Sequence, residues 1–229
     1  MRVVVMGGTA GIGLAVAEQL TNEGAEVIVT GRNPERLAAV KDRVSAAEQV
    51  DGTAEAEVAT FLERVGQVDH LVLAFSPGSV GMGPVREIGG DLVRAAFEGK
   101  LFGYLSAIRH ADVTGSITMI SAVSARTAYP GTVALAAVNG AIEAIVPPLA
   151  AELAPVRVNA VSPGVIDTQW WSFLDAETRA AQFAELGAGV PVGRIGRADE
   201  IASAVAYLIG AQFVTGAVLA VDGGATVAR

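Results

Sequence analysis

Cysteine is absent from the 229 residues, which excludes disulfide bonds and thiolate chemistry. Histidine occurs only at His70 and His110, too few and too far apart in sequence for a histidine-rich site, so we expect no bound metal. Basic residues number 16 against 24 acidic ones, and this net charge of −8 argues against nucleic acid as a partner. An anionic ligand would have to be held locally, by helix N-termini or a few arginines.

Long uncharged stretches are also missing. No run of about 18 uncharged apolar residues occurs, and the segment Met1–Gly7 is too short and too rich in glycine for a secretory signal. We therefore expect no membrane partner and a cytoplasmic protein. Hydrophobic residues make up 52% and charged residues only 17%, which suits strands buried on both faces. The length predicts one domain, spanning residues 1–229.

Short apolar runs alternate with amphipathic stretches along the whole chain. This alternation predicts an α/β fold, a single Rossmann-type, doubly wound parallel sheet with helices on both faces. The expected strands are 3–6, 26–30, 46–50, 70–75, 116–121, 156–161 and 218–221. The expected helices are 11–23, 34–43, 54–65, 91–111, 133–153, 175–186 and 198–209.

A glycine-rich turn follows the first expected strand and opens a helix. It reads Gly7-Gly8-Thr9-Ala10-Gly11-Ile12-Gly13. Glycines in such a turn allow a tight bend, a close approach of the backbone to a pyrophosphate, and close packing of helix on strand. An ordinary glycine-rich turn is the alternative. The strand before it, the helix after it and the second strand close behind favour a dinucleotide site.

The end of the second expected strand bears on the choice of dinucleotide. Proteins selective for NAD usually have a carboxylate here, which accepts hydrogen bonds from the ribose diol. This chain has Gly31 and then Arg32, and a guanidinium can bind a 2′-phosphate. NADP(H) is therefore favoured over NAD(H), with a solvated arginine as the alternative. Asp51, after the third strand, could accept a hydrogen bond from the adenine amino group, cap the next helix, or do both.

With these residues and two further segments, the chain resembles the short-chain dehydrogenase/reductase family over essentially its full length. The family's TGxxxGxG motif corresponds to Met6-Gly7 with Gly11 and Gly13, its RVNxVxPG segment to residues 157–164, and its terminal TG…DGG pattern to residues 215–224. The resemblance implies a sheet of about seven strands, often assembled as a homodimer or homotetramer. The candidate dinucleotide-binding residues are Gly7, Thr9, Gly11, Ile12, Gly13, Arg32, Asp51, Ala74, Pro163, Gly164, Ile166 and Thr168, the last at the nicotinamide end.

The same resemblance places the family's catalytic tetrad on residues of other types. The tyrosine and lysine of YxxxK fall on Leu135 and Asn139, the serine on Ala122, and the asparagine on Lys100. No tyrosine in the chain is followed by a lysine four residues later, so the loss does not depend on the alignment. Leucine cannot exchange a proton, and a positioned acid contributes about 10²–10⁴-fold to a rate. The standard mechanism is therefore excluded, while cofactor-borne hydride chemistry could remain.

Two residues are candidate substitutes for the missing acid, Lys100 and Ser121. Because the family's asparagine and lysine lie close together, the exchange of types between Lys100 and Asn139 leads us to expect that Lys100 reaches the ribose or a substrate oxygen. A partly exposed lysine without a role is the alternative. Trp170 and Trp171 occupy the family's substrate loop and suit a lid over an apolar small molecule. Packing against a neighbouring helix or subunit is the alternative for these tryptophans.

Three functions follow from these observations. The first is an NADP(H)-dependent oxidoreductase of unknown substrate with a non-standard active site. The second is an inactive NADP(H)-binding sensor or scaffold, and the third is a non-redox isomerase or lyase on the same fold. The missing tetrad favours the second and third, whereas the usual activity of the family favours the first, which is the function we expect.

Overall fold

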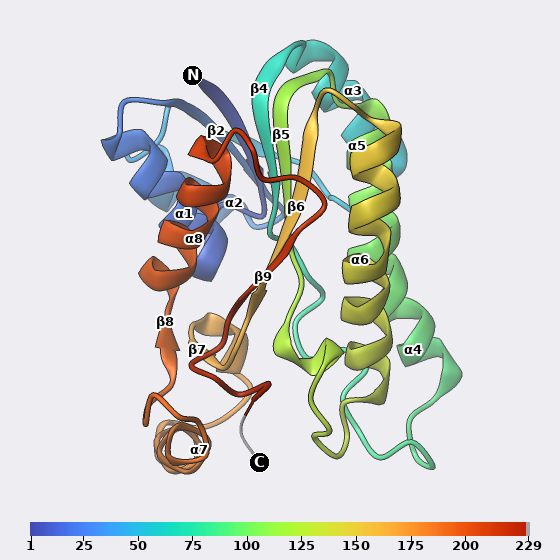
Figure 1. Ribbon diagram of the computed structural model, residues 1–229, viewed down its shortest axis with the longest axis vertical. Coiled ribbons are helices and arrows are strands. Elements are labelled where there is room, and N and C mark those ends of the chain that lie inside the picture. Colours follow the sequence, from blue (N-terminus) through green and yellow to red (C-terminus); the bar gives the residue numbers. More distant parts are fainter. Residues whose placement is uncertain (228–229) are drawn as a thin grey trace.

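The protein is built on a seven-stranded parallel sheet in the computed structural model, which describes residues 1–227 (Figure 1). The strands are β1 (Arg2–Met6), β2 (Glu26–Gly31), β3 (Ala46–Gln49), β4 (Val68–Leu73), β5 (Val113–Ile120), β6 (Arg157–Pro163) and β9 (Val218–Val221). Their order is β3-β2-β1-β4-β5-β6-β9, so the expected doubly wound sheet is confirmed. A separate pair, β7 (Ile166–Asp167) and β8 (Gly196–Arg197), was not expected, because two residues carry no periodicity.

Helices cover both faces of this sheet (Figure 1). One layer contains α1 (Gly11–Asn22), α2 (Pro34–Val40) and α8 (Ala198–Gly210), and the other contains α3 (Glu55–Val65), α4 (Gly90–Phe97), α5 (Gly103–His110) and α6 (Val133–Glu152). A further helix, α7 (Ala176–Ala188), lies at the end of the sheet near β7. Successive residues of β1 enter opposite cores, Val4 on one side and Val3 and Val5 on the other, and all three are fully buried. This inner strand is thus apolar on both faces, as the composition predicts.

The helix expected over residues 91–111 is interrupted. Between α4 and α5 lies a π-helical turn, Glu98–Phe102, with Lys100 at its centre. Two glycines let neighbouring loops press against this region. A Cβ on Gly99 would lie 2.7 Å from the ring of Pro77, and one on Gly103 would lie 2.5 Å from the carbonyl oxygen of Gly52. A widened turn does not alter the apolar pattern enough to be read from sequence, and such turns are frequent at functional sites.

Two other boundaries differ from the expected ones. The helix expected to reach residue 43 ends at Val40, because a turn must reverse the chain before β3 begins. The strand expected over 70–75 is Val68–Leu73, and Phe75 leaves the sheet beside the first glycine of the turn. A Cβ on Gly7 would lie 2.6 Å from the backbone nitrogen of Phe75, so the two segments meet backbone to backbone.

Helix α6 is long and apolar enough to cross a membrane, judged by length and composition alone. In this fold it packs against the sheet, where Val138, Ile142 and Val146 belong to the buried core. The carboxylate of Glu143 lies mid-helix and is hydrogen-bonded by three side chains. The same apolar composition is expected of a helix that covers the middle of a large sheet.

Candidate active site

A cleft of about 1200 Å³ opens where the strand order reverses, between β1 and β4 at the carboxyl ends of the strands. This is where doubly wound sheets bind their ligands. All the candidate dinucleotide-binding residues line it except Gly13. It is also lined by Lys100, Ser121, Ala122, Leu135, Asn139, Trp170 and Trp171. The fold therefore brings together residues that are more than 160 positions apart in the sequence.

The glycine-rich turn has the geometry of a phosphate cradle. Gly7 and Gly11 have φ angles of +85° and +53°, which side chains rarely tolerate. Gly13 does not line the cleft. It packs against the turn itself, where a Cβ would be 2.2 Å from the carbonyl oxygen of Gly7. Ala10 gives α1 no side-chain cap, which leaves the first N–H groups of the helix to a ligand. Thr168 packs across Gly11, so the two ends of the binding segment meet.

Two guanidinium groups lie at the far end of the cleft, where α2 begins. Arg32 and Arg36 are both exposed and line the cleft, and neither has an ion-pair partner within residues 1–227. Asn33 caps the helix between them by accepting a 2.9 Å hydrogen bond from the backbone of Arg36. Arg36 was not predicted, although its spacing of four residues from Arg32 across a helix start signals it. Guanidinium groups can bind a phosphate through charge-assisted hydrogen bonds.

Asp51 also lines the cleft. Its Oδ1 accepts hydrogen bonds from the backbone and hydroxyl of Thr53, at 2.9 and 2.8 Å. The predicted helix-capping role is wrong, because Ala54 holds the N-cap position of α3 and Asp51 forms a tight turn before it. Oδ2 has no partner among the described residues, so it can still accept a hydrogen bond from an adenine.

The opposite half of the cleft contains a buried lysine. Lys100 is only 8% exposed, which overturns the alternative of a partly exposed lysine. Its Nζ atom lies 2.6 Å from Oδ1 of Asn139 and 3.3 Å from the carbonyl oxygen of Ser121. Burial lowers the pKa of Lys100 to about 7, although the carboxylate of Glu143 acts in the opposite direction.

Asn139 connects this amine to a hydroxyl group. Its Nδ2 donates to Oγ of Ser124 at 3.1 Å and to the carbonyl oxygen of Leu135 at 2.9 Å. Ser124 is buried and lines the cleft. A chain of hydrogen bonds thus runs from Lys100 through Asn139 to Ser124, beside the two apolar positions Ala122 and Leu135.

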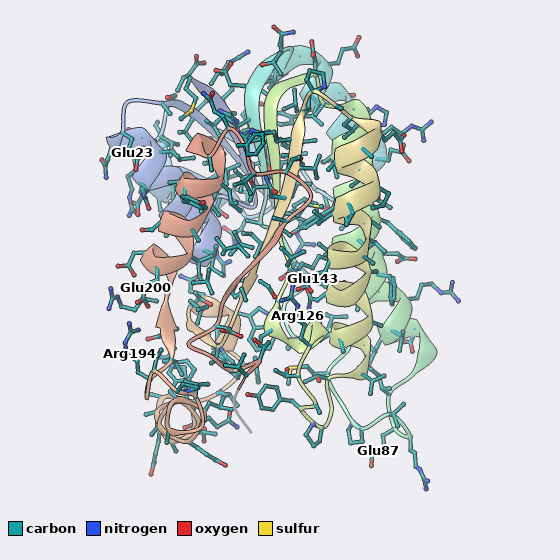
Figure 2. The ribbon with its side chains drawn as sticks, viewed as in Figure 1. Glu23, Glu87, Arg126, Glu143, Arg194 and Glu200 are labelled. Atoms are coloured by element: carbon teal, nitrogen blue, oxygen red, sulfur yellow. The ribbon has the colours of Figure 1, made fainter. Side chains whose placement is uncertain are left out.

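Glu143, one turn further along α6, holds the other serine. Figure 2 shows its side chain beside Arg126, whose Nε lies 2.7 Å from Oε2. Its Oε1 accepts from Oγ of Ser121 at 2.8 Å and from Oγ of Ser162 at 2.7 Å. The hydroxyl of Ser121 is therefore engaged by Glu143, and only its carbonyl oxygen meets Lys100. Glu143 was not predicted, although a charged residue in the interior of the apolar helix α6 is a signal of a buried polar contact.

The predicted lid residues lie in a short 3₁₀ helix, Gln169–Trp171, capped by Thr168. The rings of Trp170 and Trp171 are 4.7 Å apart and edge-to-face, and Phe173 and Phe183 extend the cluster. Nε1 of Trp171 donates to the carbonyl oxygen of Ile166 at 3.1 Å, which fixes that ring. The described side chains include no group of three or more His, Asp or Glu positioned to share a metal ion.

Comparison with known proteins agrees with this geometry. A family model described as enoyl-(acyl carrier protein) reductase matches residues 7–226. The chain belongs to the short-chain dehydrogenase/reductase family. An uncharacterized oxidoreductase of Methylorubrum extorquens is 33% identical over 96% of both chains. The cis-4-hydroxycyclohexanecarboxylate dehydrogenase of Sinomonas cyclohexanicum is 33% identical over 97% of this chain and 95% of that one.

A solved structure of a small-chain dehydrogenase in complex with NADPH is also similar. It superposes with a TM-score of 0.87 at 33% identity and covers 99% of both chains. This short-chain dehydrogenase/reductase is an oxidoreductase of a family that binds nicotinamide dinucleotides.

Proposed function

We propose that the protein is an NADP(H)-dependent oxidoreductase that interconverts a carbonyl and an alcohol on an apolar small molecule. The observation that carries the NADP(H) preference is the pair Arg32 and Arg36, which line the cleft where α2 begins and have no ion-pair partner within residues 1–227. A carboxylate would stand here in a site built for NAD(H). The NADPH found in a similar solved structure supports this preference.

The chain's own residues divide the work of binding. The cradle of Gly7 and Gly11 with the open N-terminus of α1 binds the pyrophosphate, and Thr168 holds the nicotinamide end. When bound, the nicotinamide supplies or accepts a hydride. Trp170 and Trp171 cover the apolar substrate and exclude water from it. Leu135 and Ala122 have no exchangeable proton and can only shape their half of the cleft. The proton must therefore come from a residue at another position.

A second function, an NADP(H)-binding sensor or scaffold without turnover, is favoured by one observation. The positions of the family's tyrosine and serine are Leu135 and Ala122, which hold no exchangeable proton. A non-redox isomerase or lyase would use the same cleft. The homodimer or homotetramer and the cytoplasmic location stay predictions.

Titration of the purified protein with NADPH and with NADH tests the proposal. We expect NADPH to bind at least about tenfold more tightly, since a charge-assisted bond contributes about 1.5–3 kcal/mol. Arg32→Gln should remove most of this preference and leave NADH binding within twofold. Arg94→Gln is the matched control, because Arg94 is exposed on α4 and does not line the cleft. Equal affinities in the wild type, or no binding of either nucleotide, would refute the NADP(H) assignment.

A carbonyl-substrate panel then separates the functions. Oxidation of NADPH that depends on an added carbonyl compound supports the oxidoreductase. Tight NADPH binding with no turnover of any compound supports the sensor or scaffold.

A further inference from the structure

We propose that Lys100 is a catalytic residue whose amine exchanges a proton with the substrate oxygen. This inference rests on the proposed oxidoreductase function and names the proton donor that function needs. Three observations support it: the position of Lys100 in the wall of the cleft, the hydrogen bonds of its nitrogen, and the lack of a directly bonded carboxylate among the described residues.

The backbone fixes Lys100 at the wall of the cleft. It is the middle residue of the π-helical turn Glu98–Phe102, which is packed tightly enough at Gly99 that a single added carbon would meet the ring of Pro77 at 2.7 Å. In a straight α-helix, each side chain would be rotated from its present direction from this point on. The turn therefore directs the lysine into the same wall that contains Ala122 and Leu135.

Hydrogen bonds leave one position of the nitrogen open. Nζ contacts Oδ1 of Asn139 at 2.6 Å and the carbonyl oxygen of Ser121 at 3.3 Å, and no third partner occurs among the described residues. Both contacts are acceptors, so the amine donates a hydrogen to each. The remaining position holds the third hydrogen of the ammonium, or the lone pair of the neutral amine. Because Lys100 lines the cleft, this position is available to a ligand.

The partners of Lys100 are neutral, which is unusual for a buried lysine. A buried lysine that serves stability is normally paired with a carboxylate. The one carboxylate near it is Glu143, whose oxygens are bonded by Ser121, Ser162 and Arg126. The hydroxyl of Tyr104, one turn along the helix, is bonded elsewhere: it lies 3.1 Å from the carbonyl oxygen of Phe75 and 3.3 Å from that of Ile120.

The ammonium is therefore not fixed by a direct ion pair, and burial brings the pKa of Lys100 to about 7. Both of its protonation states are then available at neutral pH, as acid–base catalysis requires. A burial cost that no ion pair offsets is a mark of a functional group rather than a structural one.

The proton step balances in both directions. In reduction, the Lys100 ammonium breaks its third N–H bond and forms an O–H bond on a carbonyl whose carbon takes the hydride supplied by the dinucleotide. The products are an alcohol and a neutral amine, which regains a proton from water. In oxidation, the neutral amine accepts the hydroxyl proton. The side chain of Asn139 and the carbonyl oxygen of Ser121 hold the nitrogen in place throughout, and neither needs to change its charge.

A measurement without turnover tests this first. The chain has only two lysines, Lys41 and Lys100, so protein labelled with ¹⁵N-lysine gives two Nζ resonances, which Lys41→Arg assigns. We expect Lys100 to titrate near neutral pH, and NADPH to perturb the resonance of Lys100 but not that of Lys41. A Lys100 that titrates at the ordinary value of a lysine would overturn the proposal.

Turnover of a probe then tests the role itself, with the aromatic 1,2-diketone 9,10-phenanthrenequinone and NADPH. Lys100→Met should lower kcat by about 10²–10⁴-fold. The Kd for NADPH and the KM for the quinone should stay within threefold, and Lys41→Met should match the wild type. Lys100→Arg, which keeps the charge but cannot release a proton, should be as slow as the methionine variant.

Other outcomes would overturn the proposal. These are Lys100→Met with near-normal kcat, a wild type that binds NADPH but does not reduce the quinone, and a borohydride-trapped quinone adduct on Lys100, which would make the amine a nucleophile. Failure to bind NADPH at all would instead refute the proposed function. Circular dichroism and NADPH affinity of Lys100→Met show whether the variant is folded.

Discussion

The Nζ atom of Lys100 donates a 2.6 Å hydrogen bond to Oδ1 of Asn139, which joins the π-helical turn to α6. By resemblance to the family, these two positions hold an asparagine and a lysine in the opposite arrangement. The chain therefore keeps an amine and an amide in contact but moves the amine to the other helix. Because the bond is internal to the protein, the protonation of Lys100 should be measurable both in stability and in spectra.

Because its amine is buried, Lys100 should make the free energy of unfolding depend on pH in the alkaline range. The pKa of Lys100 is lowered from its ordinary value of 10.5 to about 7. Between these values the unfolded chain binds the proton and the folded chain does not, so the free energy of unfolding rises with pH. The contribution of Lys100 should rise by about 1.4 kcal/mol per pH unit within this window and be constant below pH 7.

Urea unfolding of the wild type and Lys100→Met at pH 6, 7.5 and 9 measures this contribution as a difference, in which other groups cancel. The free energy of unfolding of the wild type should increase relative to that of Lys100→Met as pH rises. A difference independent of pH would show that Lys100 titrates alike in the folded and unfolded states.

Two neighbouring substitutions should move the pKa of Lys100 in opposite directions. Asn139→Asp places a carboxylate against the amine and should raise the pKa by about 1–3 pH units, since an opposite charge favours the ammonium. Glu143→Gln removes a carboxylate that raises the pKa of Lys100, so this variant should lower that pKa. The ¹⁵N titration measures both. Shifts of the same sign in the two variants would contradict this electrostatic account.

The sheet and the dinucleotide cleft were predictable because their signals are local. Alternating apolar segments define βαβ units, and the turn from Gly7 to Gly13 marks the first unit as the candidate dinucleotide site. The order of the strands follows once the family is recognised.

The network around Lys100 was only partly predictable, because it depends on contacts between distant segments. The resemblance to the family predicted that Lys100 lies near Asn139, but the direction of a side chain on a π-helical turn and the depth of its burial depend on how Pro77 packs on Gly99. Ser121 was a candidate acid by position, yet Glu143, 22 residues away, holds its hydroxyl. The packing of distant segments decides where such side chains point and which partners they bond, and the local sequence pattern does not encode this packing.

Two helical glycines should respond oppositely to alanine. In Gly13→Ala the new Cβ would lie 2.2 Å from the carbonyl oxygen of Gly7, so the cradle must move. We expect a loss of about 1–3 kcal/mol in stability and at least tenfold weaker NADPH binding. Gly140→Ala meets nothing within 4 Å in the interior of α6 and should stabilise the protein by about 0.5–1 kcal/mol. Thermal unfolding and NADPH titration of both variants test this, and equal effects would contradict it.

Arg157 should be a stability residue rather than a site residue. Its guanidinium donates 2.8 Å hydrogen bonds to the carbonyl oxygens of Leu208 and Ile209 at the end of α8. These carbonyls have no partner within the helix, and the helix dipole favours a cation there. Arg157→Met should cost about 2–3 kcal/mol of the free energy of unfolding, while Arg157→Lys should retain part of it. Unfolding in urea would contradict this role if the methionine variant lost less than about 0.5 kcal/mol.

The two tryptophans should differ in what they contribute to the lid. The indole nitrogen of Trp171 is bonded to the carbonyl oxygen of Ile166, and its ring lies 5.6 Å from that of Phe183, so it holds the segment together. Trp170 makes no such bond among the described residues and lines the cleft. We therefore expect Trp170→Leu to weaken the binding of an apolar ligand without unfolding the lid, and Trp171→Leu to lower the stability of the protein.

Steady-state reduction of 9,10-phenanthrenequinone separates these roles. Trp170→Leu should raise the KM for the quinone about tenfold, the loss of one aromatic contact of about 1–1.5 kcal/mol, and leave the Kd for NADPH within twofold. Phe213→Leu is the control, because this phenylalanine is fully exposed and does not line the cleft. If Trp170→Leu left the KM unchanged while Trp171→Leu raised it at unchanged stability, the assignment of the two rings would have to be reversed.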